Sequence, residues 1–229
     1  RKDWFSARQL CRQGPASRAL LLAEPNRMQF ILLFLMSLTL AGCFTAGKRG
    51  GEEALAIYDL GMVSVLPSDK QRRKPPVAIE VRAPLWFDSM GIEYRLAYVD
   101  KSRLREYGRA RWAGPPAQLI QQRLVQQLGF VVHGQSRAGC VLRFDITEFS
   151  QVFDSPNASH ALLQGRLQWM DRSRTNIAAR DVNLASDSPS ADARGGVTAL
   201  SASIEQLTVT IRDWEAELLA AGQLKACGA

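Results

Sequence analysis

Hydrophobic and polar side chains alternate in several segments of the chain, which is typical of β-strands with one buried and one solvated face. The clearest case begins at Cys140, where Leu142 and Phe144 share its face and polar side chains occupy the other. Strands are expected at 54–60, 77–81, 92–98, 140–147, 161–169 and 177–184. The turn-like residues 171–176 predict that the last three segments are antiparallel neighbours.

Two further segments have the spacing of amphipathic helices. Pro115 and Pro116 can open the first helix, because the first turn does not use its N–H groups, and Gly129 ends it. Its apolar stripe is Ala117, Ile120, Leu124 and Leu128. The second helix carries a narrow apolar seam before Gly222: Val197, Leu200, Ile204, Leu207, Ile211, Trp214 and Leu218. We expect it to lie across its own sheet, which predicts a single α+β domain: a mainly antiparallel sheet with a central helix and a long C-terminal helix packed on it.

An uncharged apolar run at 30–40, FILLFLMSLTL, is too short to span a membrane. The residues that follow it, Leu40-Ala41-Gly42-Cys43, are similar to the lipobox of bacterial lipoproteins, in which the signal peptide is cut before a cysteine that carries lipid such as palmitate. The alternative is a chance cysteine behind a buried helix. We therefore expect a leader and signal peptide at 1–42 (with Met28 as an alternative start), a lipidated Cys43 and flexible tether at 43–53, and a domain at 54–229.

Phe44 directly follows the expected lipid-bearing cysteine. In enteric lipoproteins an Asp at this place retains the protein in the inner membrane, so Phe44 predicts the periplasmic face of the outer membrane. Disulfides persist in this compartment of the bacterial envelope. Beyond Cys43 the chain has Cys140 and Cys227, which either form a disulfide or remain two unpaired buried cysteines.

The formal net charge of +7 at first suggests a nucleic-acid-binding protein. Residues 1–42, however, contain six Lys and Arg against Asp3 and Glu24, so more than half of that charge belongs to the leader. The basic run at 70–74 is interpreted as a solvated loop in preference to the alternative, a contact with anionic lipid headgroups. We expect no nucleic-acid partner, and contact with a membrane through the lipid anchor.

Side chains suited to catalysis are scarce. His133 and His160 are the two histidines of the chain, and they fall on different predicted elements. The sequence has no H-E-x-x-H, G-x-S-x-G or Cys-x-x-Cys motif. No nucleophile is followed by a base at a recognisable spacing. We expect no enzymatic activity, no cofactor and no metal.

Four stretches resemble those of a known family, the auxiliary lipoproteins of ABC-type transport systems, which includes the lipoprotein of the paraquat-inducible (Pqi) intermembrane transport system. The most specific is YGRARWAGPPAQL at 107–119. The others are YDLG at 58–61, IEVRAP at 79–84 with IEYR at 92–95, and EFSQVF at 148–153 with Trp214 in the last helix. The resemblance covers residues 54–218, nearly the whole expected domain.

The resemblance implies a non-catalytic part of a machine that moves lipids between the inner and outer membranes. Its partners would be an MCE-domain protein, which forms a periplasmic conduit, and an ABC permease and ATPase in the inner membrane; a homo-oligomer is left open. The family-motif residues would be structural or would contact partners: Tyr107, Arg111, Trp112, Pro115, Pro116, Gln151 and Trp214. Of these, Arg111, Trp112 and the two prolines are expected to fix the start of the central helix.

An alternative is an outer-membrane lipoprotein that activates another envelope machine, such as a peptidoglycan synthase. Such a protein needs a long disordered tether to reach across the periplasm. The tether expected here, 44–53, is short. The sequence therefore favours the transport role.

Overall fold

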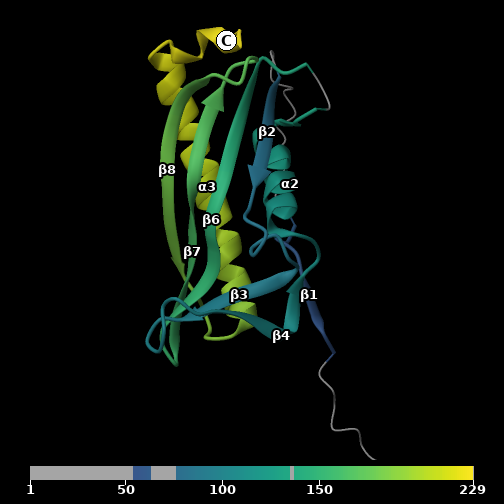
Figure 1. Cartoon of the computed structure of the whole chain (residues 1–229), viewed down its shortest axis with the longest axis vertical. Helices are drawn as coiled ribbons and strands as arrows, with labels where there is room; N and C mark the ends of the chain where they lie inside the picture. Colours follow the sequence, from purple (N-terminus) through teal and green to yellow (C-terminus); the bar gives the residue numbers. More distant parts are fainter. Residues whose placement is uncertain (1–53, 63–75, 135–136, 229) are drawn as a thin grey trace, which may run out of the picture. The chain divides into compact units, whose positions relative to one another are not determined.

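A mixed β-sheet and two helices make up the described part of the chain, residues 54–62, 76–134 and 137–228 of a computed structural model (Figure 1). The elements are β1 (Ala56–Tyr58), β2 (Val77–Arg82), β3 (Gly91–Leu96), β4 (Leu104–Trp112), α2 (Pro116–Leu128), β5 (Val131–Val132), β6 (Cys140–Ser155), β7 (Ala158–Met170), β8 (Asn176–Asp187), α3 (Ala193–Ala220) and the 3-10 helix η3 (Gln223–Cys227). This confirms the predicted α+β class. The leader, Cys43, the tether and the basic run at 70–74 lie outside the described residues.

The long strand β6 organises the sheet. It pairs antiparallel with β7, which pairs antiparallel with β8, as the alternating pattern predicts. On its other edge β6 pairs in parallel with β2 near its start and with β3 near its end, where Gln151 lies opposite Tyr94. β4 then adds antiparallel to β3, and β1 adds in parallel to β4. The longest pairings are thus antiparallel, and the parallel ones are shorter.

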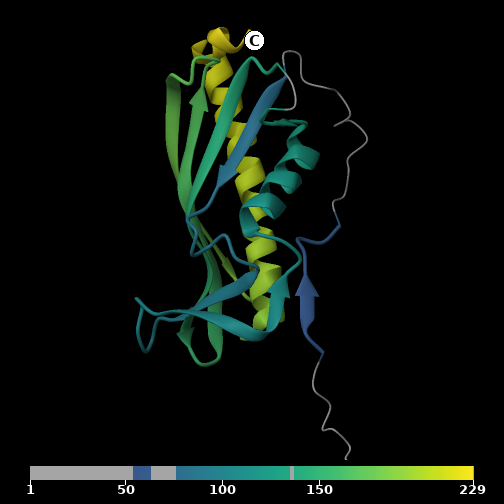
Figure 2. The ribbon, with the colours of Figure 1, turned by 45° about the vertical axis from the view of Figure 1, so that its right-hand side comes forward.

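Helix α3 lies lengthwise against β6, β7 and β8, and Figures 1 and 2 show α2 on the same side of the sheet. The predicted seam is confirmed, because Leu200, Leu207 and Ile211 are fully buried. Helix α2 buries its predicted stripe in the same core. No helix in the described ranges is both long and apolar enough to cross a membrane.

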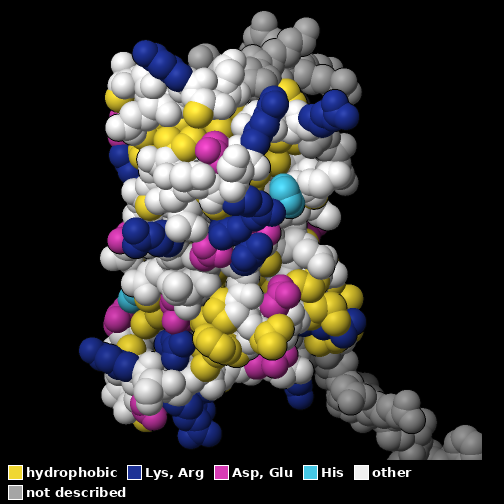
Figure 3. Space-filling view, turned by 45° about the horizontal axis from the view of Figure 1, so that its top comes forward, with side chains coloured by type: hydrophobic (Ala, Val, Ile, Leu, Met, Phe, Trp, Pro, Cys, Tyr) yellow, Lys and Arg dark blue, Asp and Glu magenta, His cyan; other side chains and the backbone are white. Residues whose placement is uncertain are grey.

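The other face of the sheet carries polar and charged side chains between small apolar areas, and Figure 3 shows Lys and Arg side chains gathered there beside a histidine. On β6, Leu142 belongs to the main core, whereas its neighbour Val141 packs on this second face against Ala78 and Met170. We call this surface the open face. It is the side of the sheet on which the helices do not pack.

The structure differs from the sequence-based expectation at two places in this part of the sheet. Strand β4 was not predicted, and Tyr98, expected in a strand, follows the end of β3 in a turn where Val99 N donates to Leu96 O. Gly195 and Gly196 lie inside the first turn of α3, which Asp192 caps. Both glycines are needed there: a Cβ on Gly195 would collide with Ser190, and one on Gly196 with Gln151.

A disulfide joins Cys140, the first residue of β6, to Cys227 in η3. Their Cα atoms lie 5.0 Å apart. The bridge therefore ties the chain beyond α3 to the start of the central strand.

Candidate functional site

Two motif side chains, Tyr107 on β4 and Gln151 on β6, form a hydrogen-bond chain with Ser159 on β7 beneath the start of α3. The Tyr107 hydroxyl donates to Gln151 Oε1 (2.8 Å), and Gln151 Nε2 donates to Ser159 Oγ (2.7 Å). Gln151 is fully buried, and the backbone of Gly196 passes directly over its amide. A buried amide must find partners for its polar atoms, so this chain fixes where α3 begins on the sheet.

Tyr107 acts here as a neutral hydrogen-bond donor. Burial, with smaller contributions from Tyr94 and Asp192, raises the pKa of its phenol above the ordinary value. Its ring packs on Tyr94, with 4.6 Å between centroids, and Tyr94 in turn meets Phe153 edge-on. The phenol therefore remains protonated at physiological pH and is unsuited to act as a base.

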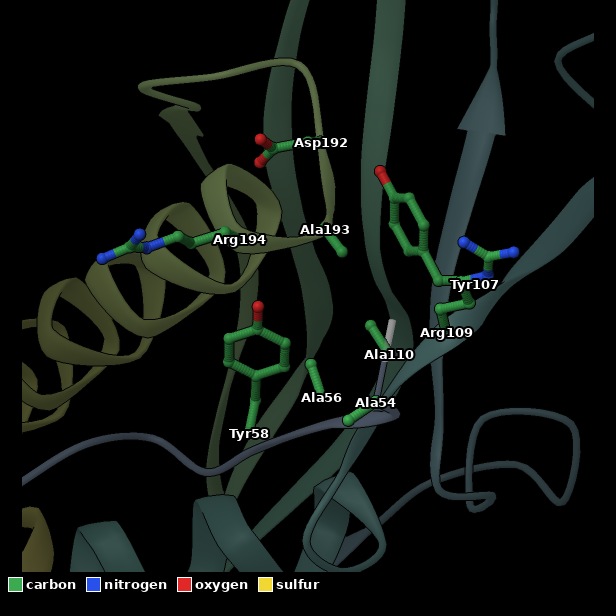
Figure 4. Close-up of a pocket in the computed structure, with 9 residues that line it drawn as sticks. All are labelled: Ala54, Ala56, Tyr58, Tyr107, Arg109, Ala110, Asp192, Ala193 and Arg194. Carbon is green, nitrogen blue, oxygen red and sulfur yellow. The ribbon is translucent and has the colours of Figure 1, made fainter. Parts of the chain in front are cut away.

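A pocket of about 340 Å³ opens beside this chain, between β1, β4 and the start of α3. It is lined by Ala54, Ala56, Tyr58, Tyr107, Arg109, Ala110, Asp192, Ala193 and Arg194. Figure 4 shows the rings of Tyr58 and Tyr107 on either side of it and the Arg194 guanidinium turned away. The Asp192 carboxylate accepts from Gly195 N (2.7 Å) and Ser190 Oγ (2.8 Å), which caps the helix and holds the pKa of Asp192 below its ordinary value. The Asp192 carboxylate therefore has a structural role as the N-cap of α3.

Four further motif residues lie at the junction of β4 with α2. Trp112 is 1% exposed and stacks on Phe149. Pro115 caps α2 and its carbonyl accepts from Gln118 N and Leu119 N, while Pro116 is the first helical residue. Arg111 pairs in register with Ile57 and Gly91 on the strands beside it. The structure thus places both prolines at the start of α2, and Arg111 and Trp112 at the end of β4 just before it.

Trp214 lies apart from the other motif residues, late in α3. It is 3% exposed, and the Arg180 guanidinium on β8 lies 5.2 Å from its ring centroid. Arg180 also pairs with Glu217 one turn further along. Trp214 therefore stabilises the packing of α3 on the edge strand β8, through the burial of its indole and a cation–π contact with Arg180.

The two histidines are far apart in the fold. His160 Nδ1 lies 2.8 Å from an Asp154 carboxylate oxygen at the β6–β7 turn, and His133 Nε2 lies 2.8 Å from Arg174 Nη2. No group of His, Cys, Asp or Glu able to hold a metal occurs within 54–62, 76–134 and 137–228. The described residues bring no nucleophile to either imidazole.

Arg123 is a structural residue that sequence reasoning passed over. It is 6% exposed, and its guanidinium donates to the carbonyls of Leu60 and Gly61 (2.6 Å to Gly61) and pairs with Glu205 at 3.1 Å. Arg123 therefore links α2 both to the segment after β1 and to α3. Its position in the sequence indicates this role, because Arg123 is the one charged residue of α2 and lies beside the apolar stripe.

The carboxyl of Glu93 on β3 has a pKa raised well above its ordinary value. Its side chain lies on β3 opposite Glu106 and is almost fully buried. Burial, together with the charges of Glu106 and Glu148 and against that of Arg95, raises its pKa from 4.5 to about 7. The folded protein therefore binds a proton here that the unfolded chain releases near pH 4.5.

This shift predicts a pH-dependent effect of Glu93→Gln. The contribution of the protonated carboxyl to stability is complete below pH 4.5 and is lost as the pH rises through about 7. The variant should therefore gain roughly 1–2 kcal/mol in free energy of unfolding over the wild type at pH 8. Urea unfolding at pH 5 and pH 8 measures it, with Glu106→Gln as the control expected to give a smaller gain. An equal gain at both pH values would assign the effect to something other than titration.

The chain matches the family described as ABC-type transport auxiliary lipoprotein component over residues 58–212. A crystal structure from Xanthomonas campestris, of family DUF330, has 20% sequence identity and a TM-score of 0.60, and the match covers 75% of this chain and 99% of that chain. A crystal structure of an uncharacterized protein has 18% identity and a TM-score of 0.55, covering 69% and 97%. A search of curated proteins found no match.

At these identities the two crystal structures support the fold alone. The family match is the stronger finding, because it extends over more than half of the chain, from β1 to α3. It includes the Tyr107–Gln151 hydrogen bond and the β4–α2 junction. The chain belongs to the family of ABC-type transport auxiliary lipoprotein components.

Proposed function

We propose that the protein is a non-catalytic, lipid-anchored periplasmic component of an MCE-type ABC transport system that moves lipids between the inner and outer membranes. Family membership, the observation that carries this proposal, assigns it to ABC-associated transport at the bacterial envelope. The match begins at the end of β1 and ends within α3, so it takes in most of the sheet, all of α2 and much of α3.

The arrangement of the polar side chains supports a binding role rather than a catalytic one. Tyr107, Gln151 and Asp192 are engaged in hydrogen bonds that position α3. The ion pair and hydrogen bonds of Arg123 on α2 likewise join elements of the domain. A domain whose polar side chains hold its own elements together suits a subunit that docks on other proteins.

Copurification tests whether the protein associates with an MCE-type transport system. The protein, extracted from membranes in mild detergent, is expected to retain an MCE-domain protein and its permease. A strain lacking the lipoprotein should show slower phospholipid exchange between the two membranes. Recovery of a peptidoglycan synthase, with stimulation of its activity and without transport components, would contradict the proposal and support the alternative function.

Cys43 is proposed as the anchor, which would hold the domain at the membrane through the tether 44–53. Cys43→Ser is expected to yield an unprocessed or soluble periplasmic protein that takes up no labelled palmitate. Membrane fractionation and acyl labelling measure this. A variant that still incorporates label and stays with the membranes would show that the anchor lies elsewhere.

Phe44 provides a separate test of the outer-membrane location. Phe44→Asp, which introduces the inner-membrane retention residue of enteric lipoproteins, is expected to move the protein to the inner-membrane fraction. Phe44→Leu is the matched control and should leave the location unchanged. Identical fractionation of both variants would contradict the proposed sorting.

A further inference from the structure

A second pocket, of about 320 Å³, lies on the open face, where β6 begins and the β7–β8 hairpin turns. It is lined by His133, Arg137, Ala138, Val141, Arg172 and Arg174. We call it the basic pocket. Its lining contains three guanidinium groups and no carboxylate, and Figure 3 shows the Lys and Arg side chains clustered beside a histidine on this face.

One partly buried carboxylate, that of Glu80, lies among the guanidinium groups beside the pocket. Glu80 accepts from Arg82 (2.9 Å to Nε), Arg143 (3.3 Å) and Arg174 (3.2 Å). Burial acts to raise the pKa of Glu80, but the hydrogen bonds and charges of Arg82 and Arg143 outweigh it and hold the pKa below its ordinary value. Glu80 therefore stays ionised and neutralises one of three positive charges.

The pocket itself keeps an excess of positive charge. Neither Arg137 nor Arg172 forms an ion pair within the described parts of the chain. Arg174 Nη2 lies 2.8 Å from His133 Nε2, and because a guanidinium only donates, this nitrogen is the acceptor of a neutral imidazole. Two guanidinium groups are thus available to a ligand, and a third is held in place between His133 and Glu80.

The backbone conformation of Arg174 is an independent indication that its side chain has a functional role. Its φ is 65°, and it is the one described residue other than glycine with a positive φ. Glycine would adopt this conformation without steric cost, whereas arginine does so under strain. The turn is held by Thr175 N donating to Asp171 Oδ1 (2.9 Å) and Asp171 N donating to Thr175 O (3.0 Å). Strained residues of this kind cluster at functional positions.

We propose that the basic pocket binds a phosphate group, as a phospholipid headgroup or as free phosphate. Planar guanidinium groups match the tetrahedral oxygens of phosphate and bind them with paired hydrogen bonds. Ala138 and Val141 give the pocket an apolar wall, which continues into the cluster of Ala78 and Met170 and suits the glycerol and first acyl carbons of a lipid. Only the lipid source rests on the proposed transport function; phosphate binding stands apart from it.

The test uses the full chain with Cys43→Ser, so that an anchor cannot mimic binding. Calorimetric titration compares dihexanoyl phosphatidylglycerol below its micelle concentration, inorganic phosphate and uncharged dihexanoylglycerol. Binding of the phosphatidylglycerol, weaker at high salt and absent with dihexanoylglycerol, supports a headgroup site. Equal binding of inorganic phosphate supports the pocket with free phosphate as its ligand. No binding of either phosphate compound at millimolar concentration would overturn the proposal.

Variants assign the binding to the pocket. Arg174→Gly removes a guanidinium and relieves the positive φ, so it should keep its melting temperature while affinity falls roughly tenfold. Arg137→Gln and Arg172→Gln should each weaken binding without altering the fold. Arg166→Gln is the matched control, because Arg166 is exposed and paired with Asp181 on the β7–β8 ribbon. Unchanged affinity in all three pocket variants would overturn the assignment, as would an equal loss in Arg166→Gln.

Discussion

Replacing Trp112 with alanine is expected to lower the free energy of unfolding by about 3–5 kcal/mol. The indole is 1% exposed and stacks on Phe149 of β6, with 5.8 Å between ring centroids. It lies in the same core as Ile120 of α2, at the point where β4 ends and the chain turns into the helix. Truncation therefore removes apolar contacts and leaves a cavity that a sheet and a helix cannot easily close. Chemical denaturation measures the loss.

Trp86→Ala is the matched control for this prediction. Trp86 is 66% exposed, in the loop between β2 and β3, so its truncation should change stability by less than about 0.5 kcal/mol. A complementation assay separates structural from partner-contact roles. A Trp112→Ala variant with unchanged stability and lost complementation would contradict the structural role and mark Trp112 as a partner contact.

The helices and the β6–β8 ribbon could be predicted from sequence because their patterns are local. Helix α2 has a proline start, an apolar stripe and Gly129 in the left-handed conformation as its end. Strand β4 shows no such pattern: its side chains include Arg105, Arg109 and Arg111, and along its length burial is confined to Ala110 and Trp112. Its place in the sheet comes from pairing with β3 and β1 rather than from alternation.

The parallel pairing of β2 and β3 with β6 could not be predicted from the sequence either. Alternation shows that a strand has a buried face but not which strand lies beside it. β2 and β3 both attach to β6, at opposite ends, because β6 is longer than its predicted extent of 140–147 and continues to Ser155. That extension brings Gln151 opposite Tyr94 and within reach of Tyr107. The motif residues could be named from sequence, but their hydrogen bond depends on three strands meeting.

The basic pocket illustrates the same limit for sites. Its arginines come from the segment before β6 and from the β7–β8 turn, and His133 follows β5. None of these segments has a motif of its own. The turn at 171–176 was predicted from its composition, yet the positive φ at Arg174 and the contact with Glu80 on β2 arise only when the sheet is assembled.

Reduction of the Cys140–Cys227 disulfide is expected to loosen the C-terminus first and to lower the free energy of unfolding by at most about 4 kcal/mol. The two residues are separated by 87 positions, so the bridge closes a long loop of the unfolded chain and reduces its entropy. Beyond α3, burial in the core is confined to Leu224 and Cys227 among the described residues. Once the bridge is cut, η3 is held chiefly by Leu224. Hydrogen exchange should therefore quicken in η3 before it changes in β6.

The Cys140→Ser/Cys227→Ser double variant should reproduce the effect of reduction, whereas Lys225→Ser, at an exposed neighbouring position, should not. The bridge itself is tested by alkylating the oxidised mature protein without reductant and mapping its peptides by mass spectrometry. A linked peptide pair containing Cys140 and Cys227 is expected, with no alkylation of either. Alkylated thiols at both positions would contradict the disulfide and leave α3 and η3 held to the sheet by packing alone, in which case reductant should not change the stability of the domain.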